Sequence, residues 1–198
     1  MKTILLKRLI LVNITIAVIS SCGKNSKQDN TSTKIKTVKN TIKTISKTES
    51  LLETTSLTNE ALQDWFPNQL MSLQKTTTSN APMSTHGING AIANYDGNNK
   101  EKIKITLYDC SGEKGVLLLS QYSFYKNMTV DNENDYKIEK SFNKRGMEGI
   151  EAYDKNRQYS DISFLYNDRF GVNIKAYNMN RESVWESINN LKFDELLK

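Results

Sequence analysis

Residues 88–110 read INGAIANYDGNNKEKIKITLYDC and contain the clearest hairpin pattern of the chain. From residue 102 onward Ile103, Ile105 and Leu107 share one face, and the lysines and threonine between them share the other. Such alternation is typical of a strand that is buried on one side. The turn-forming run DGNN at 96–99 separates it from a second strand-like stretch. The two segments are therefore predicted to be adjacent antiparallel strands.

Four further runs downstream alternate with the same two-residue period. In the last run Phe170, Val172 and Ile174 share a face, and the tight turn Asn167-Asp168 connects it to the run before. These connections are too short for the crossover that a parallel pair needs, so the strands are predicted to be antiparallel neighbours. The four runs span residues 136–142, 147–153, 159–166 and 169–177.

Helices are predicted around these strands. Thr58 is a suitable N-cap for a helix that Pro67 ends, and Asn180 is a suitable N-cap for a closing helix. Residues 113–126 form a long segment with few β-branched side chains, which favours another helix. Together the patterns predict an α+β fold, with an antiparallel sheet of about six strands and helices covering one face.

The amino end has the layout of a secretory signal. Lys2, Lys7 and Arg8 make it basic, and a mostly apolar run follows at 9–19. That run is shorter than the roughly 20 apolar residues of a transmembrane helix. A cleaved leader is the better interpretation.

The segment ISSC at 19–22 resembles the lipobox of bacterial lipoproteins. The resemblance implies that residues 1–21 are a signal peptide and that the sulfur of Cys22 carries a diacylglyceryl group. Two acyl chains are enough for stable membrane anchoring. Gly23 stands where some Gram-negative lineages place an aspartate as an inner-membrane retention signal, so the outer membrane is favoured. The alternative is an ordinary cleaved signal that ends near a cysteine.

The basic charge of the whole chain is unevenly placed. Without residues 1–21 the chain has 24 basic and 22 acidic side chains, and residues 56–198 have 17 basic and 19 acidic ones. A nearly neutral domain gives no electrostatic argument for nucleic-acid binding. The membrane, through the lipid, is the expected partner, and a protein partner is possible.

Residues 22–55 are rich in Lys, Thr, Ser and Asn and contain no aromatic side chain. Such a segment buries too little apolar area to offset its ordering entropy, so it is predicted to be a flexible tether between the lipid and an exported domain at 56–198. Ile35, Val38 and Ile42 open a short heptad-like pattern. A short helix that pairs with another copy or a partner is the alternative.

The sequence offers little for catalysis. His86 is the single histidine and lies in a polar stretch without a nucleophile motif nearby. With Cys22 acylated, Cys110 is the single remaining thiol, so an intramolecular disulfide is excluded. Cys110 is expected to be a small buried side chain. Asp109, Glu151 and Asp168 are the best candidates for acid–base chemistry and become interesting only if they share a cleft. No catalytic residue is therefore predicted.

No cofactor or metal site is predicted either. One histidine and one thiol cannot supply the soft ligands of a zinc site. Residues 131–135 alternate like the start of an EF-hand, but Tyr136 replaces its required glycine and Phe142 its bidentate glutamate. A surface turn is the preferred interpretation.

Tyrosines are frequent on the predicted strands. Tyr108, Tyr153, Tyr159 and Tyr177 are predicted to line the outer face of the sheet, with packed rings and solvated hydroxyls. The alternative is a flat aromatic surface for a protein, peptide or glycan partner, because tyrosine is enriched at interfaces.

A sequence resemblance covers nearly all of residues 57–198. The residues that carry it are Leu62 with Trp65-Phe66-Pro67, ANY at 93–95, ITLYD at 105–109, Tyr136, Gly149 and Glu151, DRF at 168–170, and Leu191, Phe193 and Leu196-Leu197. The order of these apolar and turn residues resembles that of a family of uncharacterised bacterial envelope lipoproteins, which implies a shared fold and no known activity. In that family a glycine is common near the end of the last strand, where Tyr177-Asn178 stands here.

These patterns together predict a membrane-anchored lipoprotein whose exported domain has a non-enzymatic role in binding or in the cell envelope. The alternative is an immunity or inhibitor protein that protects against a toxin in the periplasm.

Overall fold

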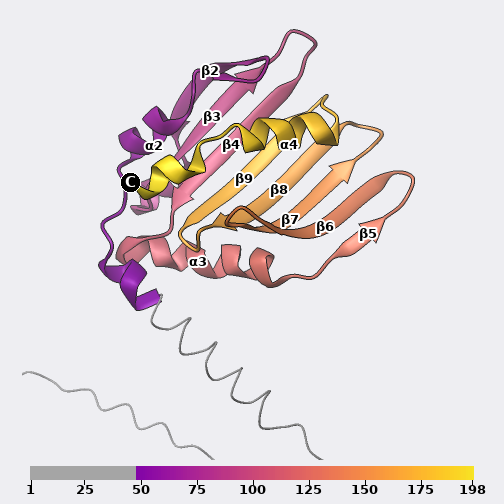
Figure 1. The fold of residues 1–198 in the computed structure, drawn as a ribbon. Coiled ribbons are helices and arrows are strands. Elements are labelled where there is room, and N and C mark those ends of the chain that lie inside the picture. The colour runs from indigo at the N-terminus through magenta and orange to yellow at the C-terminus, as the bar shows by residue number, and fades with distance from the viewer. Residues whose placement is uncertain (1–47) are drawn as a thin grey trace, which may run out of the picture. The chain divides into compact units, whose positions relative to one another are not determined.

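The computed structural model describes residues 48–198, so Cys22, the predicted signal and residues 22–47 of the predicted tether lie outside the described part. Within it, nine strands form one antiparallel sheet in the order β1-β2-β3-β4-β9-β8-β7-β6-β5 (Figure 1). The predicted α+β class is confirmed. The strands are β1 (Gln69–Leu70), β2 (Leu73–Asn80), β3 (Gly90–Asp96), β4 (Lys102–Asp109), β5 (Asp131–Glu133), β6 (Lys137–Lys144), β7 (Met147–Asp154), β8 (Tyr159–Tyr166) and β9 (Phe170–Tyr177).

The prediction of about six strands is wrong, because three strands at the two ends of the sheet lack an apolar pattern. β2 reads LQKTTTSN and is almost entirely exposed after its first residue, and β5 reads DNE and is exposed throughout. β1 has two residues. Such strands bury little surface, so hydrophobic periodicity does not reveal them.

The helices cover both faces of the sheet, which corrects the prediction that they cover one. The large core cluster joins α2 (Asn59–Trp65), α4 (Arg181–Asn189) and the 3₁₀ helix η2 (Phe193–Leu197) to the face that carries Ile103 and Ile105. The smaller cluster joins α3 (Gly112–Asn127) and the 3₁₀ helix η1 (Pro82–His86) to the opposite face. In Figure 1, α4 crosses in front of the sheet and α3 runs along its lower end.

Several local predictions are confirmed. The Thr58 hydroxyl accepts a hydrogen bond from the backbone N–H of Ala61 at 3.2 Å, and the side-chain oxygen Oδ1 of Asn180 accepts one from the backbone N–H of Ser183 at 2.8 Å. Both caps satisfy amide groups that the first helical turn leaves free. Asn167 and Asp168 both have positive φ in the short turn between Tyr166 and Phe170, the last paired residues of the hairpin.

Ordered structure begins before residue 56. Residues 48–53 are helical, and the Leu51 side chain is 7% exposed. Residues 48–53, near the end of the segment predicted as a flexible tether, therefore form a helix. In the described residues no helix combines the length and apolar character needed to cross a membrane.

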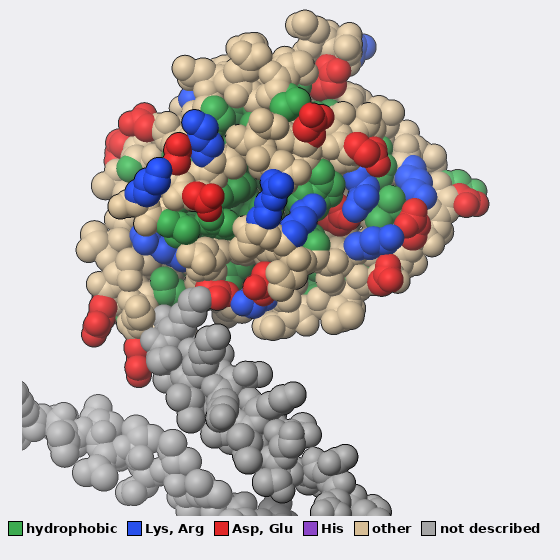
Figure 2. Space-filling view, viewed as in Figure 1, with side chains coloured by type: hydrophobic (Ala, Val, Ile, Leu, Met, Phe, Trp, Pro, Cys, Tyr) green, Lys and Arg blue, Asp and Glu red, His purple; other side chains and the backbone are tan. Residues whose placement is uncertain are grey.

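Basic and acidic side chains are intermixed over the face of the domain shown in Figure 2, with hydrophobic side chains between them. This agrees with the nearly balanced charge of residues 56–198.

Candidate functional site

A groove of about 390 Å³ lies on the α3 face of the sheet, between α3 and η1. Strands β3, β4 and β9 form its floor. The groove has a size typical of small-molecule sites in proteins. It is the best candidate for a functional site in the part of the chain that the structure describes.

One side of the groove is apolar. Met83 comes from η1, Leu118 and Tyr122 from α3, and Ile92 from β3. Met83 and Leu118 are only partly buried, although they pack against the smaller core cluster. Their exposed carbon atoms offer surface that an apolar ligand would remove from water.

The part of the floor formed by Lys104, Thr106, Asn173 and Lys175 is polar and basic. Lys104 of β4 and Lys175 of β9 are direct cross-strand partners, and both line the groove. Like charges opposite each other in a sheet are unfavourable. Lys175 lies 3.7 Å from a carboxylate oxygen of Asp161, whereas within residues 48–198 Lys104 has no carboxylate within 4.0 Å. The floor therefore carries an excess positive charge.

The α3 wall of the groove is fixed by Tyr122. Its ring lies over Gly171 of β9, where an added Cβ would come within 2.2 Å of the ring. Its hydroxyl donates a hydrogen bond to the side-chain oxygen of Asn173 at 2.7 Å. Burial raises the pKa of Tyr122 above its ordinary value of 10. The absence of a side chain at Gly171 is what allows α3 to approach the sheet this closely.

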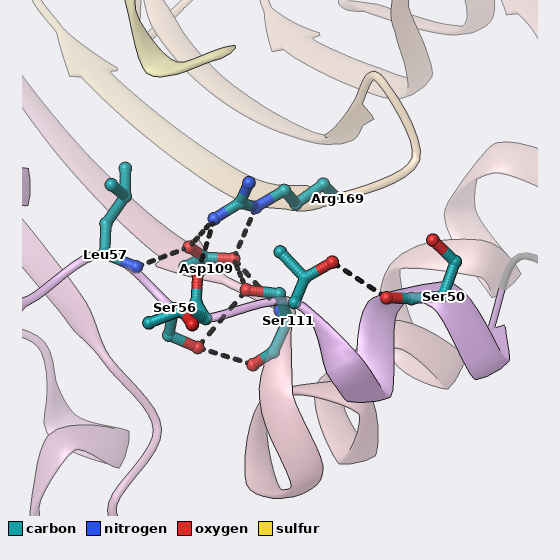
Figure 3. Close-up of polar contacts among 8 residues, drawn as sticks. Ser50, Ser56, Leu57, Asp109, Ser111 and Arg169 are labelled. Carbon is teal, nitrogen blue, oxygen red and sulfur yellow. Dashed lines mark hydrogen bonds and ion pairs between the residues drawn. The ribbon is translucent and has the colours of Figure 1, made fainter. Parts of the chain in front are cut away.

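A buried carboxylate holds the amino end of α3 (Figure 3). Asp109 is fully buried and accepts hydrogen bonds from Nε of Arg169 at 3.0 Å and from Nη2 at 2.7 Å. It also accepts bonds from the backbone N–H and the hydroxyl of Ser111, the residue before α3. Bidentate Arg–carboxylate pairs of this kind fix the relative orientation of the two side chains and also neutralise their charges.

The same carboxylate holds the chain segment that enters the domain. The backbone N–H of Leu57 donates to Oδ2 of Asp109 at 2.9 Å, and Nη2 of Arg169 donates to the carbonyl of Thr55 at 3.3 Å. The hydroxyl of Ser56 donates to the carbonyl of Ser111 at 2.6 Å. We call Thr55, Ser56, Leu57, Asp109, Ser111 and Arg169 the entry cluster. It joins the entering segment, the end of β4 and the β8–β9 turn.

The three carboxylates proposed for acid–base chemistry belong to separate ion clusters. Asp109 pairs with Arg169, as above. Glu151 of β7 lies on the α4 face and accepts hydrogen bonds from Arg181 and from the indole N–H of Trp185. The hydrogen bond between Arg181 and Glu151 raises the pKa of Arg181. Asp168 pairs with Lys126 at 2.6 Å.

The four predicted tyrosines do not form one surface. Tyr159 and Tyr177 are neighbours on the α3 face, with ring centroids 5.1 Å apart. Tyr108 lies on the same face but lines the groove and is only 8% exposed. Tyr153 is on the opposite face, because it follows Glu151 by two residues in β7. Of these four tyrosines, Tyr159 and Tyr177 are therefore the two whose rings lie side by side.

The remaining candidates have structural surroundings. Cys110 is fully buried in the smaller core cluster, and burial raises the pKa of its thiol to about 12. His86 is exposed at the end of η1, where its ring lies 3.1 Å from the Thr85 hydroxyl. Glu133, in the EF-hand-like segment, pairs with Lys140 and Lys155. The described residues contain no group of three or more His, Cys, Asp or Glu side chains arranged to hold a metal ion.

Sequence patterns alone missed the residues that build this site. The polar face of β4, including Lys104, was visible as alternation, but its pairing with Lys175 depends on the order of the sheet. Arg169 follows Asp109 by 60 residues, and no local spacing connects them. The groove has no sequence motif.

No protein-family model, curated protein or solved structure was found to match this chain.

Proposed function

We propose that this chain is a membrane-anchored lipoprotein whose exported domain is a non-enzymatic binding module and takes its ligand in the groove between α3 and η1. The observation that carries the proposal is the composition of the groove. Apolar side chains line one side, and two neighbouring lysines lie on the floor. A mostly apolar concave site with a few convergent polar groups is the usual form of a ligand site.

The state of the buried carboxylates supports a binding role over an enzymatic one. Asp109 and Glu151 are each held by an arginine and further hydrogen-bond donors. A carboxylate engaged in this way is a poor general base, because proton transfer would break its ion pair. The groove lining contains neither residue.

The anchoring part of the proposal rests on the lipobox-like ISSC segment at 19–22. Cells expressing wild type, C22S or C110A would be labelled with an alkyne analogue of palmitate and fractionated. We expect label and membrane association for wild type and C110A, and loss of both for C22S. Equal labelling of C22S and wild type would exclude an anchor at Cys22.

The binding part is tested by native mass spectrometry of protein extracted from the cell envelope. Leu118 lines the groove, whereas its neighbour Leu117 is 69% exposed and does not. We expect a bound molecule on wild type and on L117W, and its loss from L118W, because the larger ring fills the groove. If wild type, L117W and L118W each show only the mass expected for their own lipidated polypeptide, with no added molecule, a ligand-binding role is contradicted.

The immunity or inhibitor role stays a second prediction. Its test is co-purification with a secreted effector, followed by a protection assay in cells that lack this protein.

A further inference from the structure

The groove has an apolar part and a basic part. Met83 and Leu118 offer exposed carbon on the α3 and η1 side, while Lys104 and Lys175 lie at the strand floor. Thr106 and Asn173, also cross-strand partners, lie on the floor between the lysines and the end of β4. A ligand that fits both parts must itself have an apolar and an anionic end.

The charge around the floor supports an anion. On the α3 face, Lys102, Lys104 and Lys175 face the carboxylates of Asp96 and Asp161. Lys102 lies 3.8 Å from Asp96, and Lys175 lies 3.7 Å from Asp161, which leaves the charge of Lys104 without a counterion among the described residues. An anionic group between Lys104 and Lys175 would offset their repulsion across the strand pair.

From this arrangement we infer that the groove binds a monoanionic amphiphile, a carboxylate that carries a medium-length alkyl or acyl chain. The inference rests on the proposed function and adds the chemistry of the ligand. The carboxylate lies between Lys104 and Lys175. The alkyl chain lies against Leu118, Met83 and Ile92, where its burial removes apolar surface from water.

The experiment measures the affinities of three probes with the same chain length: octanoate, 1-octanol and octylammonium. The protein is the full-length exported chain with Cys22→Ser, so that the attached lipid does not compete for the probes. We expect octanoate to bind most tightly and octylammonium most weakly. Added salt is expected to weaken the binding of octanoate more than the binding of octanol, because salt screens exposed charge pairs.

Lysine variants locate the anionic end. We expect K104Q and K175Q each to weaken octanoate binding by about two- to five-fold, the range for exposed ion pairs, and to leave octanol unchanged. Lys102 is the matched control, because it lies on the same strand and face, two residues from Lys104, and does not line the groove. K102Q is expected to bind octanoate with the same affinity as the parent protein, which carries Cys22→Ser and no lysine substitution.

The outcomes separate this inference from the proposed function. If octanol binds as tightly as octanoate and L118W abolishes both, the groove is a binding site but the preference for an anion is wrong. If K102Q weakens octanoate as much as K104Q does, the attraction is general surface charge and the inference is overturned. If no probe binds while envelope-extracted protein still carries a molecule that L118W loses, the ligand class is wrong and the binding role stands.

Discussion

The carboxylate of Asp109 is fully buried and receives two hydrogen bonds from the guanidinium of Arg169, at 3.0 and 2.7 Å. This pair lies where the entering chain, the end of β4 and the start of α3 meet. Because α3 forms one wall of the groove, the entry cluster links the attachment of the domain to the shape of its candidate binding site.

Asp109→Asn tests the entry cluster. The change removes the negative charge that holds Arg169, so we expect a loss of about 3 kcal/mol in the free energy of unfolding, measured with urea. Asp96→Asn is the control, because Asp96 is 45% exposed and 3.8 Å from its partner Lys102. Its expected cost is within about 0.5 kcal/mol. Equal stability of the two variants would contradict the importance assigned to the cluster.

Glu151→Gln tests the ion cluster beneath α4. Glu151 is 4% exposed and pairs with Arg181 and the Trp185 indole. A neutral amide leaves Arg181 without its counterion, so we expect a loss of about 2 kcal/mol together with a change in tryptophan emission. Glu186→Gln, an exposed position on the same helix, should change neither quantity. An unchanged emission spectrum in E151Q would count against the contact with Trp185.

Gly171→Ala tests how α3 is seated. The new methyl group would lie 2.2 Å from the Tyr122 ring, so we expect a destabilisation of about 1–3 kcal/mol. In a Tyr122→Ala background the same change should cost clearly less, because the ring that it meets is absent. A double-mutant cycle measures this coupling. Additive effects of the two substitutions would contradict the close packing described here.

Much of the fold follows from local sequence patterns. The hairpin at 88–110, the turn at Asn167-Asp168 and the two helix caps are determined by side chains close together in the chain, and the structure has all of them. The strands β2 and β5, at the two ends of the sheet, escaped prediction because their mostly exposed polar residues bury little surface. The face that each helix covers also escaped it, because it depends on packing between residues far apart in the chain.

The candidate site was less accessible to sequence reasoning. Alternation assigned Lys104 to an exposed face correctly, but the groove depends on β9 lying next to β4 and on α3 crossing that face. The same topology separates Tyr153 from Tyr108, Tyr159 and Tyr177, which the sequence grouped by residue type. Long-range pairing, as between Asp109 and Arg169, leaves no trace in local spacing.

Alkaline pH should weaken the fold. Burial raises the pKa of the Cys110 thiol from 9 to about 12, and burial with the neighbouring Asp194 raises that of Tyr166 from 10 to about 12. Between these values the folded protein keeps protons that the unfolded chain releases. The free energy of unfolding should therefore fall between about pH 9 and pH 12. Urea titrations at pH 8, 9, 10 and 11 measure the slope.

Cys110→Ala is the control for the thiol contribution and should reduce the slope. A thiol reagent offers a second readout, since Cys110 of native protein should react at pH 8 only as fast as the protein unfolds. Rapid reaction without denaturant would contradict the burial of this side chain.

The central claim is that the groove between α3 and η1 is the binding site, and the location of a bound probe tests it most directly. Octanoate would be titrated into ¹⁵N-labelled full-length protein with Cys22→Ser, while amide chemical shifts are followed. We predict that saturable shifts concentrate at residues 82–83, 104–108 and 118–122. The account would be contradicted by saturable shifts confined to other surfaces. Examples are the pair Tyr159 and Tyr177 and the small pocket beside α4 that Arg145 and Asp194 line.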